Sequence, residues 1–237
     1  MRLRARFQKL GKVRWTSHRD VARMWERACR RVQLPLAWTG GFSPRPKLSF
    51  GLALPTGAES LAEYLDLELA PDAVVDVDDL PARLSPALPA GVDVTAVATV
   101  DPKAPSLQED VVCCEWRLGF ALGVDLAAAV DLAALVDRAL ASSSLLVERE
   151  RKGRLSVDDV RPAILALTAE ATAGGEPELE ALLATRPRAL RPQELLRALD
   201  PDLEASRVCR THQWIERDGL REEPLAVAPH AAGARAQ

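Results

Sequence analysis

The sequence lacks the patterns that identify several common classes of protein. It has no apolar run near the roughly 20 residues that a transmembrane helix requires. Its first residues alternate between charged and apolar, unlike a signal peptide, so we expect a cytoplasmic protein that makes no membrane contact. No GxGxxG, P-loop or nucleophile-elbow pattern is present, so nothing indicates nucleotide binding of those types or serine-based hydrolysis.

Residues that bind metals are few and poorly spaced. The four cysteines form neither a CxxC pair nor a disulfide framework, which favours a reducing compartment. The three histidines form no HxH or HExxH pattern. We therefore expect no metal site and no cofactor.

Positive charge is concentrated at one end of the chain. Residues 1–50 contain 13 Lys and Arg against Asp20 and Glu26, a net charge of +11, whereas the whole chain carries −3. The remainder therefore carries −14. Such asymmetry predicts either a surface that faces a polyanion or one that pairs with the acidic part of the same protein. In the second case Asp66 and Glu68 would pair across a sheet with Arg2, Arg4 and Arg6.

Hydrophobic periodicity predicts an α+β protein built from two tandem ferredoxin-like units with antiparallel sheets. In the first unit, residues 1–103, strands are expected at 2–8, 48–54, 64–69 and 92–100, and helices at 17–34 and 79–88. In the second, 107–218, strands are expected at 111–122, 145–150, 163–171, 179–185 and 207–215, and helices at 126–141 and 192–199. Residues 101–106 are the expected linker, and 221–237 the expected disordered tail.

The first predicted helix has two distinct faces. Ser17 is suited to cap it, with Asp20 three residues later. An apolar stripe runs from Val21 to Val32 at helical spacing, and the opposite face carries Arg19, Arg23, Arg27 and Arg30. The loop that follows adds Arg45 and Lys47, and its Phe42 either stacks on a base or anchors the loop in the core.

Three segments resemble a bacterial protein family of unknown function, the radical-SAM-linked (radical-SAM-associated) family. The segments are Arg14-Trp15-Thr16-Ser17-His18-Arg19-Asp20, then Gly41-Phe42-Ser43-Pro44-Arg45-Pro46, then Gly57 with Ser60, Glu63 and Tyr64. The resemblance covers residues 1 to about 215 and implies a partner radical SAM protein, encoded nearby or fused in relatives. Arg19 departs from the family pattern, which often has an apolar residue there.

A radical SAM enzyme holds its four-iron cluster with a Cx3Cx2C motif, which this sequence does not contain. We therefore expect an accessory protein that holds an RNA substrate for the partner. The expected RNA-binding residues are Arg14, Arg19, Arg23, Arg27, Arg30, Phe42, Arg45 and Lys47. A protein–protein adaptor without RNA binding is the alternative that the same surface allows.

His18 offers a different hypothesis. In the first turn of a helix the dipole favours a neutral imidazole, which can accept a proton. The tandem ferredoxin-like architecture also resembles the RAMP-type endoribonucleases, which use a histidine after the first strand. His18 would then be the general base of a metal-independent ribonuclease, although the glycine-rich C-terminal loop of those enzymes is missing.

Overall fold

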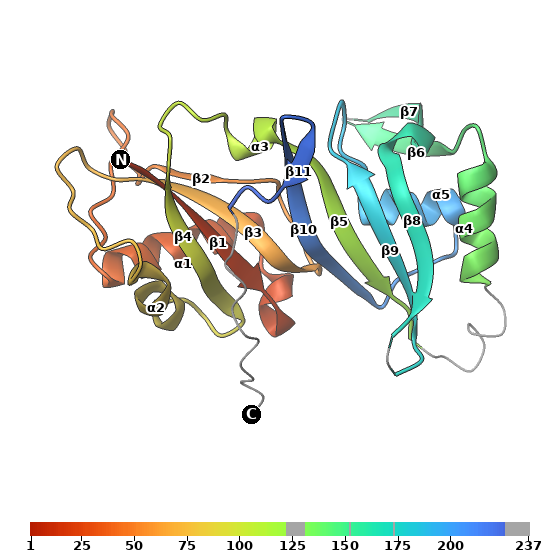
Figure 1. Cartoon of the computed structure of the whole chain (residues 1–237), viewed down its shortest axis with the longest axis horizontal. Coiled ribbons are helices and arrows are strands. Elements are labelled where there is room, and N and C mark those ends of the chain that lie inside the picture. The colour runs from red at the N-terminus through yellow and green to blue at the C-terminus, as the bar shows by residue number, and fades with distance from the viewer. Residues whose placement is uncertain (122–130, 152, 173, 226–237) are drawn as a thin grey trace. The chain divides into compact units, whose positions relative to one another are not determined.

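The computed structural model describes residues 1–121, 131–151, 153–172 and 174–225 (Figure 1). The chain divides into two compact units. Unit 1 comprises Met1–Asp110 and the described residues from Ile215 onward, and unit 2 comprises Val111–Trp214. No helix in the described ranges combines the length and the apolar character that crossing a membrane demands.

Unit 1 is ferredoxin-like, with the predicted βαββαβ order. Its strands are β1 (Arg2–Lys9), β2 (Leu48–Phe50), β3 (Glu59–Glu68) and β4 (Val92–Val100). Its helices are α1 (His18–Arg31) and α2 (Leu80–Leu84), which a 3-10 turn, η2 (Ser85–Ala87), extends. The sheet order is β4-β1-β3-β2, and each neighbouring pair is antiparallel. A 3-10 helix, η1 (Gly11–Trp15), connects β1 to α1.

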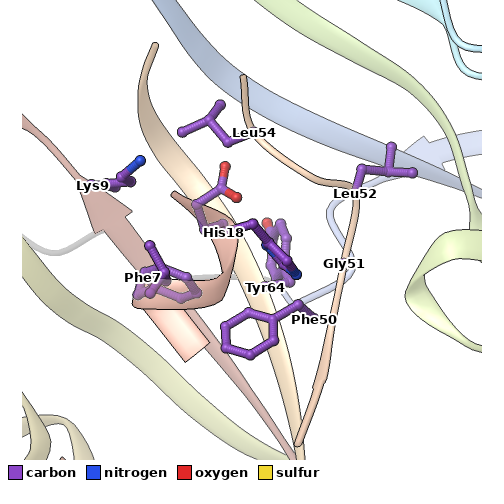
Figure 2. A pocket seen from close by; sticks show the side chains of 10 residues that line it. Phe7, Lys9, His18, Phe50, Gly51, Leu52, Leu54 and Tyr64 are labelled. Carbon is purple, nitrogen blue, oxygen red and sulfur yellow. The ribbon is translucent and has the colours of Figure 1, made fainter. Parts of the chain in front are cut away.

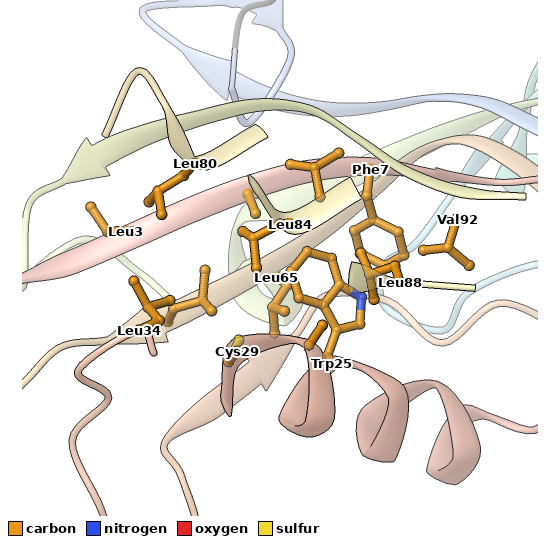
Figure 3. Close-up of a cluster of buried hydrophobic side chains, with 14 of the residues drawn as sticks. Leu3, Phe7, Trp25, Cys29, Leu34, Leu65, Leu80, Leu84, Leu88 and Val92 are labelled. Carbon is orange, nitrogen blue, oxygen red and sulfur yellow. The ribbon is translucent and has the colours of Figure 1, made fainter. Parts of the chain in front are cut away.

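The core of unit 1 follows from the alternation in β1 and the stripe on α1. Leu3, Ala5 and Phe7 point to one side of β1 and are buried, as the alternation predicts. On α1, the stripe buries Trp25 completely, and its ring meets the Phe7 ring edge-on, with centroids 5.0 Å apart (Figure 3). Leu84 of α2 packs into the same cluster. This packing fixes α1 against the sheet, so its arginine face must point to solvent.

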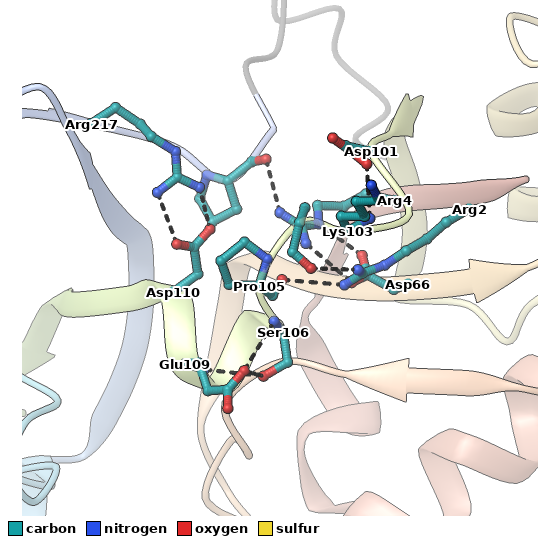
Figure 4. Close-up of polar contacts among 12 residues, drawn as sticks. Arg2, Arg4, Asp66, Asp101, Lys103, Pro105, Ser106, Glu109, Asp110 and Arg217 are labelled. Atoms are coloured by element: carbon teal, nitrogen blue, oxygen red, sulfur yellow. Dashed lines mark hydrogen bonds and ion pairs between the residues drawn. The ribbon is translucent and has the colours of Figure 1, made fainter.

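The other side of β1 carries arginines that pair with carboxylates of the protein itself (Figure 4). Arg4 Nε donates to Asp66 Oδ1 at 2.7 Å, and Arg2 also pairs with Asp66. Arg6 Nη2 lies 3.1 Å from Glu223 Oε1. The expected pairing with Asp66 is therefore present for two arginines, while Glu68 pairs with Lys47 instead, at 2.8 Å.

The chain returns to unit 1 near its end, so the boundaries differ from the expected ones. Arg217 Nη1 donates to Asp110 Oδ1 at 2.8 Å (Figure 4). A short helix, α3 (Leu107–Asp110), and a strand, β11 (Leu220–Glu222), belong to this unit. Residues 221–225, expected in a disordered tail, contain part of β11, the Glu223 ion pair and Leu225, which packs near Tyr64. Residues 226–237 lie outside the described residues.

Unit 2 repeats the topology of unit 1. Its main strands are β5 (Val111–Gly119), β8 (Ile164–Ala171), β9 (Pro177–Ala184) and β10 (Arg207–Arg217), with α4 (Leu132–Ala141) and α5 (Pro192–Leu199) as its helices. The sheet order β10-β5-β9-β8 corresponds to β4-β1-β3-β2 of unit 1. Helix α4 packs on β8 and touches α5. The expected helix began at 126, but residues 122–130 lie outside the described part.

One hairpin in unit 2 differs from the sequence prediction. Residues 145–150 were expected to join the main sheet, but β6 (Leu146–Arg151) pairs with a strand that the sequence did not predict, β7 (Arg154–Asp159). The two form a separate antiparallel sheet. The backbone hydrogen bonds between β6 and β7 satisfy this hairpin without pairing to the main sheet. Hydrophobic periodicity cannot distinguish a strand in a separate hairpin from a strand in the main sheet.

Candidate nucleic-acid interface

The first turn of α1 is fixed by its cap. The backbone N–H of Asp20 donates to Ser17 Oγ at 3.2 Å, and the Ser17 hydroxyl donates to Asp20 Oδ2 at 2.7 Å. That second bond lowers the pKa of Asp20, with a smaller contribution from Arg23. Ser17 and Asp20 therefore define where the helix begins, as the sequence predicts.

His18 lies beside a small pocket at this end of the helix (Figure 2). Its ring meets the Phe50 ring edge-on, with centroids 5.2 Å apart. Lys9, Glu63 and Tyr64 line the same pocket. The volume is about 20 Å³, room for about one water molecule. The fold thus brings His18 near a lysine and a glutamate, but around a space too small for a nucleotide.

Lys9 is the pocket residue that sequence reasoning missed. Its side chain is buried, and Nζ donates to the carbonyl oxygens of Arg14 and Thr16, at 3.2 Å each. Lys9 lies two residues after Phe7, on the side of β1 that the alternation buries. The apolar pattern marks hydrophobic residues only, so it gives no sign that a lysine occupies the next buried position.

The remaining motif residues on β3 have structural contacts. The Tyr64 hydroxyl accepts from Arg6 Nε and donates to Glu223 Oε1, at 3.3 Å each, and burial raises the pKa of Tyr64. Ser60 is fully buried and accepts from the backbone N–H of Ala62 at 3.2 Å. These contacts hold the strand and its neighbours in place.

The face of α1 opposite the core forms the basic helix face, defined here as Arg19, Arg23, Arg27 and Arg30. All four side chains are exposed. Arg23 lies 3.3 Å from Asp20, an exposed pair of the kind that contributes little. In the described part of the chain, the other three have no ion pair. The basic helix face is therefore largely uncompensated, unlike the arginines of β1.

The loop after α1 is a small hairpin, residues 37–47, which we call the aromatic hairpin. Thr39 N donates to Arg45 O at 2.8 Å, Lys47 N donates to Ala37 O at 2.9 Å, and Trp38 bridges to Pro46. The tip spans residues 40–44, where Gly41 has a φ of +104°, and Pro44 closes it. Pairing of this kind gives the tip a defined backbone.

Phe42 stands at the tip of the aromatic hairpin and is completely exposed. This excludes the alternative in which Phe42 anchors the loop in the core. Trp38, which the sequence prediction left out, is 53% exposed on the same hairpin. Arg45 is exposed, and no acidic partner for it is found among the residues that the structure describes. The hairpin therefore presents two aromatic rings and an unpaired cation to solvent.

Two of the expected anion-binding residues have internal partners. Arg14 lies 3.5 Å from Glu59 and 5.3 Å from the centre of the Trp15 ring. Lys47 lies 2.8 Å from Glu68. Both remain partly exposed, but their charge is offset. Of the expected cationic residues, those of the basic helix face and Arg45 thus remain available to an anion.

No described group of three or more His, Cys, Asp or Glu side chains is arranged to hold a metal ion. All four cysteines are buried, and burial raises the pKa of Cys29 to about 12. Thiols in such surroundings are poor nucleophiles and poor ligands.

A protein-family model described as "Uncharacterized protein conserved in bacteria (DUF2344)" matches residues 2–192. The match includes unit 1 up to Asp110 and continues through unit 2 to the first residue of α5. The search of curated proteins gave no match.

Proposed function

The chain belongs to a family of uncharacterized proteins conserved in bacteria (DUF2344), and from that premise we propose that it is a non-catalytic accessory protein that holds RNA. The RNA backbone would lie on the basic helix face and reach Arg45. A partner radical SAM enzyme would carry out the chemistry, and tRNA or rRNA modification is the reaction class we propose.

The observation that supports RNA binding is the contrast between two sets of arginines in unit 1. On β1, Arg2 and Arg4 both pair with Asp66, and Arg6 pairs with Glu223. The basic helix face has Asp20 as its ion-pair partner among the described residues, and that pair is exposed. Four like charges on 12 residues of helix repel one another, which costs free energy unless an anion binds. A phosphodiester chain supplies that anion.

The aromatic hairpin supports RNA over a simple anion. The fully exposed Phe42 ring contributes no packing energy to the free protein, whereas nucleobases stack on such rings. The unpaired Arg45 on the same hairpin provides the adjacent phosphate contact. Single-stranded or loop RNA, with bases free to stack, fits this combination better than a duplex.

A salt titration tests RNA binding directly. Five phosphate contacts, from the basic helix face and Arg45, predict an affinity that falls about a hundredfold or more between 50 and 200 mM salt. Fluorescence anisotropy with labelled tRNA measures it. Binding that does not change with salt, or no binding at low salt, would overturn the proposal.

The proposal of a radical SAM partner rests on the resemblance of residues 14–64 to the radical-SAM-linked family. Affinity capture from cells, followed by identification of both protein and RNA, tests it. Recovery of a radical SAM protein after ribonuclease treatment supports direct contact between the two proteins. If charge reversal at Arg23, Arg27 and Arg30 abolishes that recovery and the protein binds no RNA, the basic helix face is an adaptor surface instead.

A second function is favoured by the side chains around His18, which is exposed, so RNA would reach it from outside the small pocket. There His18, Lys9 and Glu63 line one space, and a base beside a cation suits metal-independent RNA cleavage. Incubation with RNA in EDTA, comparing wild type with His18→Ala, decides it. Cleavage by wild type that His18→Ala abolishes would replace the non-catalytic proposal, whereas cleavage that survives in His18→Ala would exclude His18 as the base.

A further inference from the structure

Unit 2 contains a second cationic feature, a hollow of about 580 Å³ beside α5. Four of the described arginines line it: Arg149 of β6, Arg188 and Arg191 from the connection after β9, and Arg197 of α5. Its volume lies in the range of small-molecule sites, about 300–1,000 Å³. Every lining residue belongs to unit 2, so the hollow forms within one folded unit.

Arg149 forms the floor of the hollow. Its side chain is 6% exposed, and two carboxylates surround it. Nε lies 2.7 Å from Glu194 Oε1, and Nη1 donates to Asp158 Oδ2 at 2.9 Å. A buried guanidinium needs such compensation, because desolvation without a partner is very costly. Arg149 therefore organises the site and is already neutralised.

The same two carboxylates are used by other groups of the hollow. Asp158 Oδ2 also accepts from Arg188 Nη1 at 2.7 Å, and Glu194 Oε2 accepts from the backbone N–H of Arg191 at 2.9 Å. The guanidinium groups of Arg191 and Arg197 have no ion pair within the described ranges. The remaining acidic residue on the lining, Glu148, is exposed to solvent.

The lining indicates which chemistry the hollow can bind. Guanidinium groups pair with phosphate through two parallel hydrogen bonds. None of the described lining residues is aromatic, and Ala189 is the apolar one among them, so a base or lipid tail would find no contact surface there. Arginines grouped around one hollow suit adjacent phosphates better than the spaced phosphates of a nucleic-acid strand.

We propose that unit 2 binds a compact polyphosphate, either free or as the triphosphate of a nucleotide, through Arg191 and Arg197 over a floor set by Arg149. The proposal does not depend on RNA binding by unit 1. The opposing explanation is that the ion pairs merely attach the β6–β7 hairpin to α5. In that case Arg191 and Arg197 would be dispensable, since neither is in those pairs.

Isothermal titration of the full chain with inorganic triphosphate, without divalent metal, tests the proposal. We expect Arg191→Ala and Arg197→Ala each to weaken binding about tenfold. Arg191→Lys should lose less affinity than Arg191→Ala, because lysine keeps the positive charge but lacks the paired N–H donors of the guanidinium group. Arg117→Ala, exposed on β5 of unit 2 and outside the lining, is the matched control and should change affinity less than about twofold. ATP should bind about as tightly as inorganic triphosphate, because the lining offers the base no contact.

Three results would overturn the proposal. The first is no heat of binding at millimolar triphosphate. The second is equal weakening by Arg117→Ala and Arg191→Ala, which would show general attraction to positive charge. The third concerns competition by a short RNA without a terminal phosphate. If this RNA displaces triphosphate from the wild-type protein but not from Arg191→Ala, the hollow is a nucleic-acid contact. Circular dichroism on each variant confirms that the fold is retained.

Discussion

Arg4 and Asp66 face each other across β1 and β3 as a buried ion pair, each side chain only 3% exposed. Arg4 Nε and Nη2 donate to the two carboxylate oxygens at 2.7 and 3.1 Å, the bidentate geometry that makes such pairs strong. Arg2 shares the same carboxylate. One aspartate thus pairs with two arginines on the face of the sheet opposite α1.

Asp66→Asn should strongly destabilise unit 1. The variant leaves Arg4 buried without a countercharge, a change that typically costs about 3–5 kcal/mol of unfolding free energy. Urea denaturation measures the loss. Glu68→Gln removes the exposed partner of Lys47 and should cost less than about 1 kcal/mol. Equal effects of the two substitutions would contradict the distinction between the buried and the exposed pair.

Arg27→Ala and Arg30→Ala should weaken RNA binding through phosphate contacts. Each should reduce the slope of log affinity against log salt by about 1, with similar losses for different RNA sequences. Arg117→Ala is the control, because Arg117 is exposed on β5 in unit 2 and pairs with Glu180 at 2.8 Å. A slope unchanged in the α1 variants, or lowered as much by Arg117→Ala, would show that the basic helix face does not hold the backbone.

Phe42→Ala should lower affinity for single-stranded RNA but not for duplex. Loss of one stacked base corresponds to about 1–3 kcal/mol, while thermal stability should not change because the ring has no packing to lose. Phe42→Trp should keep the affinity, and Phe42→Leu should not. Equal losses of affinity for single-stranded and duplex RNA would argue against stacking on Phe42. They would not argue against binding of the RNA backbone by the basic helix face.

Gly57→Ala should destabilise the connection between β2 and β3. Gly57 has a φ of +89°, and an added Cβ would lie 2.8 Å from Cζ3 of Trp15. The positive φ costs about 1–3 kcal/mol for a residue other than glycine. The Trp15 ring is 64% exposed and can move aside, so adding Trp15→Ala should recover only a minor part of the loss.

Gly40→Ala is the matched control for that substitution. Its φ is not in the left-handed region, and an added Cβ would meet nothing within 4 Å. Chemical denaturation of both variants gives the comparison. Wild-type stability in Gly57→Ala would show that the loop relaxes without cost.

Much of unit 1 could be predicted because its signals are local or periodic. Ser17 and Asp20 mark the start of α1 through bonds three residues apart. The apolar stripe of α1 and the alternation of β1 determine which side chains are buried before any partner is known. The arginine face of α1 follows from that stripe. The order of helices and strands follows from the same kinds of periodicity along the rest of the chain.

The identity of each charged partner could not be predicted in the same way. Arg6 pairs with Glu223, 217 residues later in the chain, and Arg4 Nη1 reaches Pro224 O at 3.4 Å. Periodicity carries no information about contacts over such distances. The sequence therefore could not decide whether the positive charge faces a polyanion or pairs with acidic residues of the same chain. The structure shows that the arginines of β1 pair with acidic residues of the chain itself, whereas those of α1 are exposed.

By itself, then, the sequence determined a two-unit α+β chain with an arginine-bearing helix that begins at Ser17, because caps and periodicity act over a few residues. Tertiary structure alone decided which arginines keep a free charge, that Lys9 joins His18 and Glu63 in one pocket, and that Phe42 stands in solvent. The first two outcomes depend on packing between segments distant in sequence, such as the return of the chain to unit 1. The third depends on backbone pairing within the aromatic hairpin.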